Sequence, residues 1–164
     1  MEPRISQAYN EFMAEYDGDH YFSKRSFSNW KKNYNELKPK ITEIYEYISK
    51  LENISNKYES LKEIISKYVD YFLIKNDYRN KIKYMTHIFN DGFDLVKKRN
   101  EYFIEKEKVV YSDIFASVDG KKLTEDQMVS VITDEANNLV IAGAGTGKTL
   151  SILGARARAV FFPL

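Results

Sequence analysis

The chain has 164 residues, a formal net charge of +1, 43% hydrophobic residues and no cysteine. Its length and apolar content suffice for one ordinary domain with a buried core, and the lack of cysteine excludes disulfides and thiolate metal sites. No apolar run reaches the length that crosses a bilayer, and the acidic first residues are unlike a signal peptide. We therefore expect a cytoplasmic protein that makes no membrane contact.

The first two thirds of the chain predict helices. Pro39 suits a first helical turn. Apolar residues then recur at steps of three and four, at Ile41, Ile44, Ile48, Leu51, Tyr58, Leu61, Ile65, Tyr68 and Phe72. This pattern predicts one helix about 50 Å long, at 1.5 Å per residue, whose apolar stripe needs a partner.

Two further helical stretches follow. Asn76-Asp77 is expected to end the first helix, and the turn signal Asn90-Asp91-Gly92 to end the second. Their apolar stripes are Tyr78, Ile82, Met85 and Phe89 for the second stretch, then Val96, Phe103, Val110 and Ile114 for a third over residues 93–116. We expect an antiparallel helical hairpin or small bundle, in which most tyrosines pack with a solvated hydroxyl group.

The small net charge hides an uneven distribution. Residues 1–20 carry a net charge of −4, residues 123–164 carry −1, and the stretch between them carries +6. Its basic residues form the short runs Lys31-Lys32, Lys97-Lys98-Arg99 and Lys121-Lys122. Such runs are more often solvated faces than a nucleic-acid footprint, so we interpret them as solvated.

A turn and a helix start are predicted near residue 120. Asp119-Gly120-Lys121-Lys122 indicates the turn, and Leu123-Thr124-Glu125-Asp126-Gln127 precedes an apolar helical run. Thr124 as N-cap and Gln127 three residues later form a capping box. A glutamine amide can also both donate to and accept from adenine, so Gln127 has a second interpretation as the residue that selects ATP. The two interpretations are compatible, because the cap fixes where the glutamine stands.

The strongest motif lies behind the apolar run Leu139-Val140-Ile141, in a strand predicted over 138–142. It reads Ala142, Gly143, Ala144, Gly145, Thr146, Gly147, Lys148 and Thr149. The glycines let the backbone turn so that consecutive N–H groups can point at phosphate oxygens. Lys148 supplies charge for the outer phosphates and Thr149 a hydroxyl ligand for Mg²⁺. The loop then opens a helix, whose N-terminus favours an anion, so a nucleotide with Mg²⁺ is the predicted ligand.

The stretch from Leu123 to Gln127, the strand, and the loop from Ala142 to Thr149 together resemble the start of the UvrD/Rep-type superfamily 1 DNA helicases. They are most similar to the helicase IV-like branch, in which a helical extension precedes the motor, and the resemblance is specific from about Asn100 to Gly154. It implies a mainly α chain. A helical hairpin or bundle over residues 1–120 would be followed by the start of a P-loop α/β (RecA-like) domain over 121–164.

The resemblance also implies roles for these residues. In the family the glutamine contacts adenine, the loop holds the phosphates, the lysine stabilises the transferred phosphoryl group and the threonine binds Mg²⁺. These roles fall on Gln127, on residues 142–147, on Lys148 as the catalytic residue and on Thr149 as the metal ligand. The complete family member hydrolyses ATP to move along single-stranded DNA, usually 3′ to 5′, and separates strands.

Other family motifs do not follow Thr149 in this sequence. The acidic strand end, the arginines that sense the γ-phosphate and the DNA-gripping motifs have no counterpart in the last fifteen residues, so we expect an N-terminal fragment with turnover near zero. Residues 155–164 turn to arginine and alanine, a change that fits an altered reading frame, a truncated gene product or residues added in cloning as well as it fits a natural short terminus.

Two alternatives remain open. One is a non-catalytic helical interaction module with a relic P-loop, which binds a protein partner or associates with itself. The other is a different P-loop ATPase with a helical arm, which the spacing of Gln127 disfavours.

Overall fold

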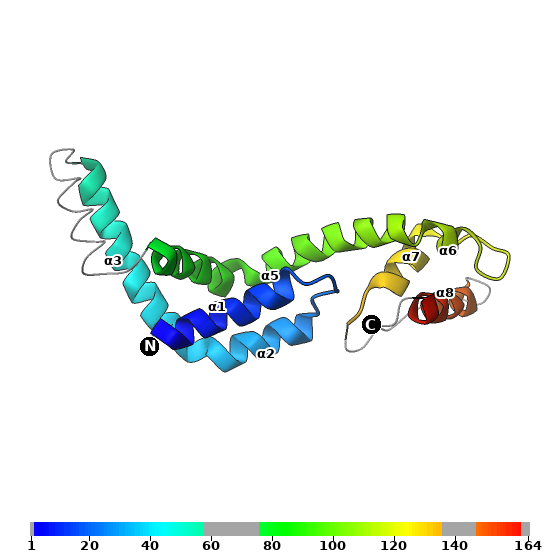
Figure 1. The fold of residues 1–164 in the computed structure, drawn as a ribbon, viewed down its shortest axis with the longest axis horizontal. Coiled ribbons are helices and arrows are strands. Elements are labelled where there is room, and N and C mark those ends of the chain that lie inside the picture. Colours follow the sequence, from blue (N-terminus) through cyan, green and yellow to red (C-terminus); the bar gives the residue numbers. More distant parts are fainter. Residues whose placement is uncertain (1, 58–75, 136–146, 162–164) are drawn as a thin grey trace. The chain divides into compact units, whose positions relative to one another are not determined.

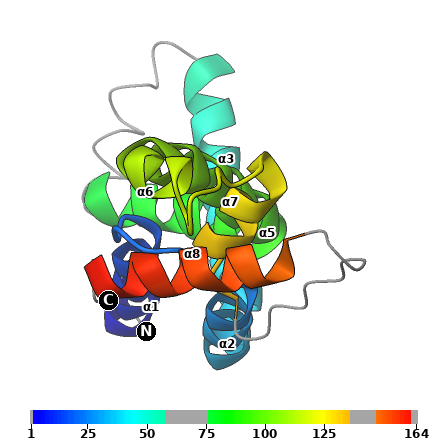
Figure 2. The same ribbon diagram turned by 90° about the vertical axis from the view of Figure 1, so that its right-hand side faces the viewer.

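The computed structural model describes residues 2–57, 76–135 and 147–161, and this part of the chain is mainly helical (Figures 1 and 2). Its elements are α1 (Glu2–Tyr16), α2 (Lys24–Tyr34), the 3₁₀ helix η1 (Asn35–Leu37), α3 (Lys38–Lys57), α5 (Asn76–Val110), α6 (Ser112–Ala116), α7 (Glu125–Ile132) and α8 (Lys148–Phe161). The expectation of a mainly α chain is thus confirmed. The strand predicted over 138–142 and the loop over 142–146 lie outside the described residues.

None of the described helices is both long enough and apolar enough to cross a membrane.

The chain packs as two compact units, and α2 and α5 contribute residues to both. One unit comprises residues 1–18 and 27–95, and the other comprises 19–26 and 96–164. The boundary predicted near residue 120 is of another kind, because it divides the chain by expected function, into a helical extension and the start of a motor domain, and not by packing. It stays a prediction.

An aromatic cluster holds the first unit together. Here α1 and α2 run antiparallel beside each other (Figure 1), and the indole N–H of Trp30 donates to the carbonyl oxygen of Ala8 at 2.9 Å. The Trp30 ring meets Phe12 edge to face, with centroids 5.3 Å apart, and stacks on Phe27 at 6.0 Å. All three rings are buried, so this contact between α1 and α2 is the centre of the unit's core.

The first predicted helix is confirmed in the part that the structure describes. Pro39 lies in the first turn of α3, where its missing N–H is not needed, and Ile41 and Ile48 are buried. The rest of the predicted stripe, from Tyr58 to Phe72, lies outside the described residues.

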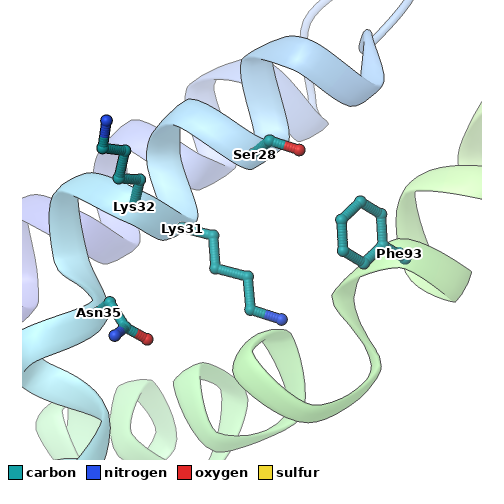
Figure 3. Close-up of a pocket in the computed structure, with 5 residues that line it drawn as sticks. All are labelled: Ser28, Lys31, Lys32, Asn35 and Phe93. Carbon is teal, nitrogen blue, oxygen red and sulfur yellow. The ribbon is translucent and has the colours of Figure 1, made fainter.

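The predicted turn at Asn90-Asp91-Gly92 is wrong, because α5 runs through it without a break. A Cβ atom on Gly92 would overlap the ring of buried Phe27, so glycine is needed there for a close approach between helices. The next residue, Phe93, lies beside α2 (Figure 3). Asp91 stays exposed and accepts a bond from His87 one turn earlier, at 2.9 Å, which suits a helix.

The two apolar stripes predicted along α5 differ in how fully their residues are buried. Tyr78, Ile82, Met85 and Phe89 are all buried, as predicted for the second stretch. In the third stretch Val96 and Phe103 are buried, but Val110 is 53% exposed and α5 ends there.

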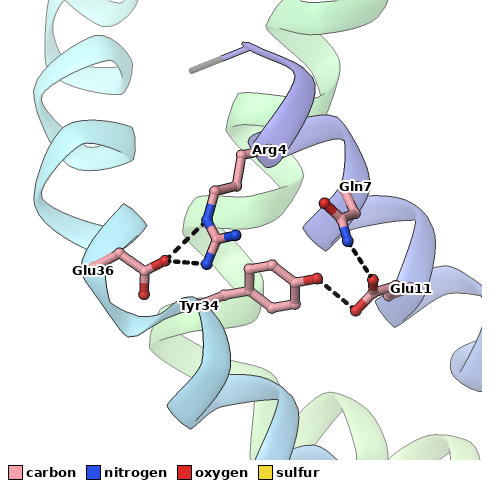
Figure 4. Close-up of polar contacts among 5 residues, drawn as sticks. All are labelled: Arg4, Gln7, Glu11, Tyr34 and Glu36. Carbon is pink, nitrogen blue, oxygen red and sulfur yellow. Dashed lines mark hydrogen bonds and ion pairs between the residues drawn. The ribbon is translucent and has the colours of Figure 1, made fainter.

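A polar network joins the start of α1 to the end of α2 and to η1 (Figure 4). The Tyr34 hydroxyl donates to Glu11 at 2.6 Å, and the same carboxylate accepts from Gln7 at 2.9 Å. Arg4 donates twice to Glu36, at 2.7 and 3.1 Å. Burial of Tyr34 and its bond to the Glu11 carboxylate raise the pKa of Tyr34 to about 12, and that bond lowers the pKa of Glu11.

Replacing Gly92 tests the close approach of α5 to Phe27. Alanine normally stabilises a helix interior by roughly 1 kcal/mol over glycine. Here we expect Gly92→Ala to lower the free energy of unfolding by roughly 1–3 kcal/mol, because the new methyl group overpacks the core. Urea unfolding measures the change, with Asn90→Ala on the exposed side of the same helix as control. A Gly92→Ala chain as stable as the control would contradict the packing.

The raised pKa of Tyr34 predicts a loss of stability at high pH. The unfolded chain releases this proton near pH 10 and the folded chain near pH 12, so folding stability that is complete below pH 10 falls as the pH rises toward 12. Tyr34→Phe should lower stability by about 0.5–1.5 kcal/mol at pH 8 and should show a smaller loss between pH 10 and 12. Urea midpoints measured across this range test it, and equal pH slopes in the two proteins would contradict it.

Candidate nucleotide-binding site

A tight turn leads into the site. Asp119 and Gly120 have φ values of 52° and 73°, and Val118 and Lys121 close the turn with backbone bonds of 2.8 and 3.0 Å. This confirms the turn predicted at 119–122. Two residues later the Leu123 N–H donates to the Phe115 carbonyl oxygen at 2.9 Å, which fixes the chain just before α7.

The predicted capping box is present at the start of α7. The Thr124 N–H donates to Oε1 of Gln127 at 2.8 Å, and the Gln127 N–H donates to the Thr124 hydroxyl at 3.4 Å. Glu125 and Asp126 occupy the first turn, where the helix dipole favours negative charge. The Gln127 side chain therefore folds back toward the N-terminus of α7, where Thr124 holds its amide oxygen.

The same amide reaches the residue that precedes α8. Its Nε2 donates to the carbonyl oxygen of Gly147 at 3.4 Å, across twenty residues of sequence. Gly147 has a φ of 84°, and a Cβ atom there would overlap Nε2 of Gln127. The positive φ at this position favours glycine, and a larger residue would displace the amide of Gln127.

Helix α8 begins directly after this contact. Lys148 and Thr149 form its first turn with exposed side chains, and the Ser151 N–H donates to the Gly147 carbonyl oxygen at 3.1 Å. The first-turn N–H groups have no intrahelical acceptor and can serve an anion.

Close packing holds α7 and α8 side by side (Figures 1 and 2). A Cβ atom on Gly154 would lie 3.0 Å from Cδ1 of Leu123 and 3.4 Å from Cγ2 of Val131. Leu123 and Val131 belong to a buried cluster with Phe103, Tyr111, Phe115, Val118 and Ile132. The position of Lys148 relative to Gln127 therefore rests on an apolar core.

A basic side chain anchors the start of α7 from another helix. Lys108 of α5 donates to Glu105 on its own helix and to Glu125, the first residue of α7. These bonds raise the pKa of Lys108, so its ammonium group stays charged. The Lys108 side chain is only 13% exposed, but the Glu125 side chain is 66% exposed, so solvent screens this ion pair.

Glu135 fastens the segment that follows α7. Its carboxylate accepts from the Lys24 N–H at the start of α2, at 3.0 Å, and from the Tyr21 hydroxyl at 3.3 Å. Burial of Tyr21 and the Glu135 charge raise the pKa of that tyrosine. Nearby, the buried amide of Asn100 donates to the Phe22 carbonyl oxygen at 2.8 Å and accepts from the Phe22 N–H at 3.1 Å.

The structure thus brings together four of the predicted site residues: Gln127, Gly147, Lys148 and Thr149. The remaining ones lie outside the described residues; they are Ala142, Gly143, Ala144, Gly145 and Thr146. Lys108, Glu135 and Asn100 were not predicted from the sequence. No local pattern marks them, because their partners lie 17, 111 and 78 residues away.

Comparison of the chain with protein-family models, with curated proteins and with solved structures finds no match in any of the three.

Two glycines with a similar backbone give a test of the contact between Gln127 and Gly147. Both Gly120 and Gly147 have positive φ, but a Cβ atom on Gly120 would meet nothing within 4 Å. Alanine at either position strains the backbone by roughly 1–2 kcal/mol. We expect Gly147→Ala to cost more than Gly120→Ala in urea unfolding, because it also displaces Gln127.

The excess cost should vanish in a Gln127→Ala background, where no amide is left to displace. Equal costs for the two alanine variants in the parent chain would contradict the close contact.

Proposed function

We propose that this chain binds ATP with Mg²⁺ through Gln127 and the loop that ends at Lys148 and Thr149. The observation that carries the proposal is the contact between the Gln127 amide and Gly147. It sets the predicted adenine-selecting residue against the end of the predicted phosphate loop. The two motifs lie twenty residues apart in the sequence, and their contact supports assigning them to one ligand.

The residues at the start of α8 fit a polyphosphate. The positive φ of Gly147 and the helix start after it leave first-turn N–H groups for phosphate oxygens. The exposed Lys148 side chain can pair with the outer phosphates, and the Thr149 hydroxyl would be a ligand for Mg²⁺. When bound, the metal would neutralise charge on the phosphates.

Gln127 would select the base. A glutamine amide presents a donor and an acceptor, which match N7 and the N6 amino group on the Hoogsteen edge of adenine, whereas guanine presents two acceptors, N7 and O6, on that edge. The capping box and the bond to Gly147 hold this amide in place, so the energetic cost of ordering it is met before a nucleotide binds.

The wider proposal follows from the resemblance. With the extension, the glutamine and the loop in this order, the chain is best explained as the N-terminal, ATP-binding part of a UvrD-like, ATP-dependent DNA helicase of the helicase IV-like branch. Sequencing the genomic region after the codon for residue 154, in all three frames, tests this. An acidic strand motif and arginine motifs are expected there, and a locus without them would favour an interaction module.

Nucleotide binding by residues 1–164 can be measured with a fluorescent ATP analogue in the presence of Mg²⁺. We expect weak binding without steady hydrolysis, because phosphoryl transfer needs several charge-stabilising groups at once. Lys148→Ala should weaken binding about tenfold or more, since it removes a charge-assisted bond to phosphate. Lys98→Ala, an exposed lysine on α5, is the matched control and should leave binding unchanged.

Competition by ATP and GTP separates the two roles of Gln127. Thr124→Ala removes the cap but keeps the amide, while Gln127→Ala removes both. If the amide selects adenine, only Gln127→Ala erodes the preference for ATP. An equal change in both variants would leave capping as the whole role of Gln127, and a folded chain that binds no nucleotide would overturn the proposed function.

A further inference from the structure

Helices α2 and α5 form a small hollow within the first unit (Figure 3). It has a volume of about 250 Å³ and is lined by Ser28, Lys31, Lys32, Asn35 and Phe93. We call it the Phe93 hollow. Lys31-Lys32 was interpreted from the sequence as a solvated run, but the structure sets an aromatic ring beside it.

Phe93 is a half-exposed ring on a rigid support. Its surface is 49% exposed, although phenylalanine is usually buried. Its ring meets Phe27 edge to face, with centroids 4.8 Å apart and an interplanar angle of 89°. Phe27 is fully buried, so this contact fixes the direction of the exposed ring.

The surroundings of this ring are basic. The eleven residues of α2 include four basic side chains and no acidic one. The Lys31 ammonium lies 5.4 Å from the centre of the Phe93 ring, and Lys31 extends toward α5 while the Lys32 ammonium points outward (Figure 3). Of the described carboxylates, none forms an ion pair with Lys31 or Lys32.

We propose that the Phe93 hollow binds single-stranded nucleic acid. A base stacks on the exposed Phe93 ring, and the neighbouring phosphates pair with Lys31 and Lys32. Aromatic side chains beside cations are the usual combination for this ligand, because every base offers a flat face and every nucleotide a charge. An acidic peptide would use the lysines alone and leave the ring in water.

This surface is separate from the nucleotide site in its residues. If the chain is the proposed helicase, the hollow gives its helical extension a contact with the single strand. Binding is measured without ATP, so failure here and failure of the proposed function are different results.

The test is fluorescence anisotropy of a labelled twenty-nucleotide oligo(dT) with the full 164-residue chain at low salt. Phe93→Leu should weaken binding about fivefold or more, since stacking is lost while an apolar side chain remains. Phe93→Tyr keeps an aromatic ring at this position and should bind oligo(dT) as tightly as the parent chain does. Tyr102→Leu, an exposed ring elsewhere on α5, is the matched control and should bind as the parent does.

The charge contribution has its own pair of variants. The double variant Lys31→Gln with Lys32→Gln should weaken binding. The slope of log binding constant against log salt concentration should become shallower by about 0.7 for each lost phosphate contact. Lys121→Gln with Lys122→Gln makes the same charge change at the turn before α7 and should have a smaller effect. Urea unfolding of each variant confirms that the fold is kept.

Three results would overturn the proposal. They are no binding of oligo(dT) at low salt, equal binding by the parent and Phe93→Leu chains, or equal binding of a twenty-base-pair duplex, whose base faces are already stacked. Binding of labelled poly-glutamate in place of oligo(dT) would identify an acidic protein as the partner.

Discussion

Leu123 is the constraint on which the candidate site depends. Its side chain is 2% exposed within the cluster around Phe115 and Val131, its N–H is bonded to Phe115, and Gly154 of α8 packs against it. Because Leu123 directly precedes the N-cap Thr124, its burial determines where α7 starts. The register of α8 against Leu123 then determines where Gly147 lies. One buried leucine thus sets both ends of the contact between Gln127 and Gly147.

The free energies of the two kinds of contact support the view that apolar packing, more than hydrogen bonding, positions Gln127. Burying a leucine side chain contributes about 1.5–3 kcal/mol, whereas one hydrogen bond contributes about 0.5–1.5 kcal/mol net. The bond from Gln127 to Gly147 is 3.4 Å long, near the outer limit for an N–H···O bond, so it belongs at the weak end of that range. The apolar core therefore positions the glutamine, and the polar contacts orient its amide.

Features encoded within a few residues were predicted correctly from the sequence. The turn at 119–122, the capping box of Thr124 and Gln127, and the helix behind the predicted phosphate loop each depend on neighbours in the chain. The ion pair of Lys108 with Glu125 and the bonds of Glu135 to Lys24 and Tyr21 could not be predicted in this way. Their residue types are common on any solvated surface, and only the packing of distant helices makes them partners.

The same limit explains the wrong turn at Asn90-Asp91-Gly92. Asn, Asp and Gly favour turns when local preference decides, but a helix that packs closely on a large ring also needs glycine, and the sequence alone does not distinguish the two. Gly92 has the second role, because it lets α5 approach Phe27.

That close approach also shapes the surface. Phe93 follows Gly92, so the approach of α5 brings its ring edge to face with Phe27 and next to Lys31. A turn at residue 92 would have sent Phe93 elsewhere, and Lys31-Lys32 would then be an ordinary solvated run. The Phe93 hollow is therefore a consequence of a core contact, and evidence for it could come only from the folded chain.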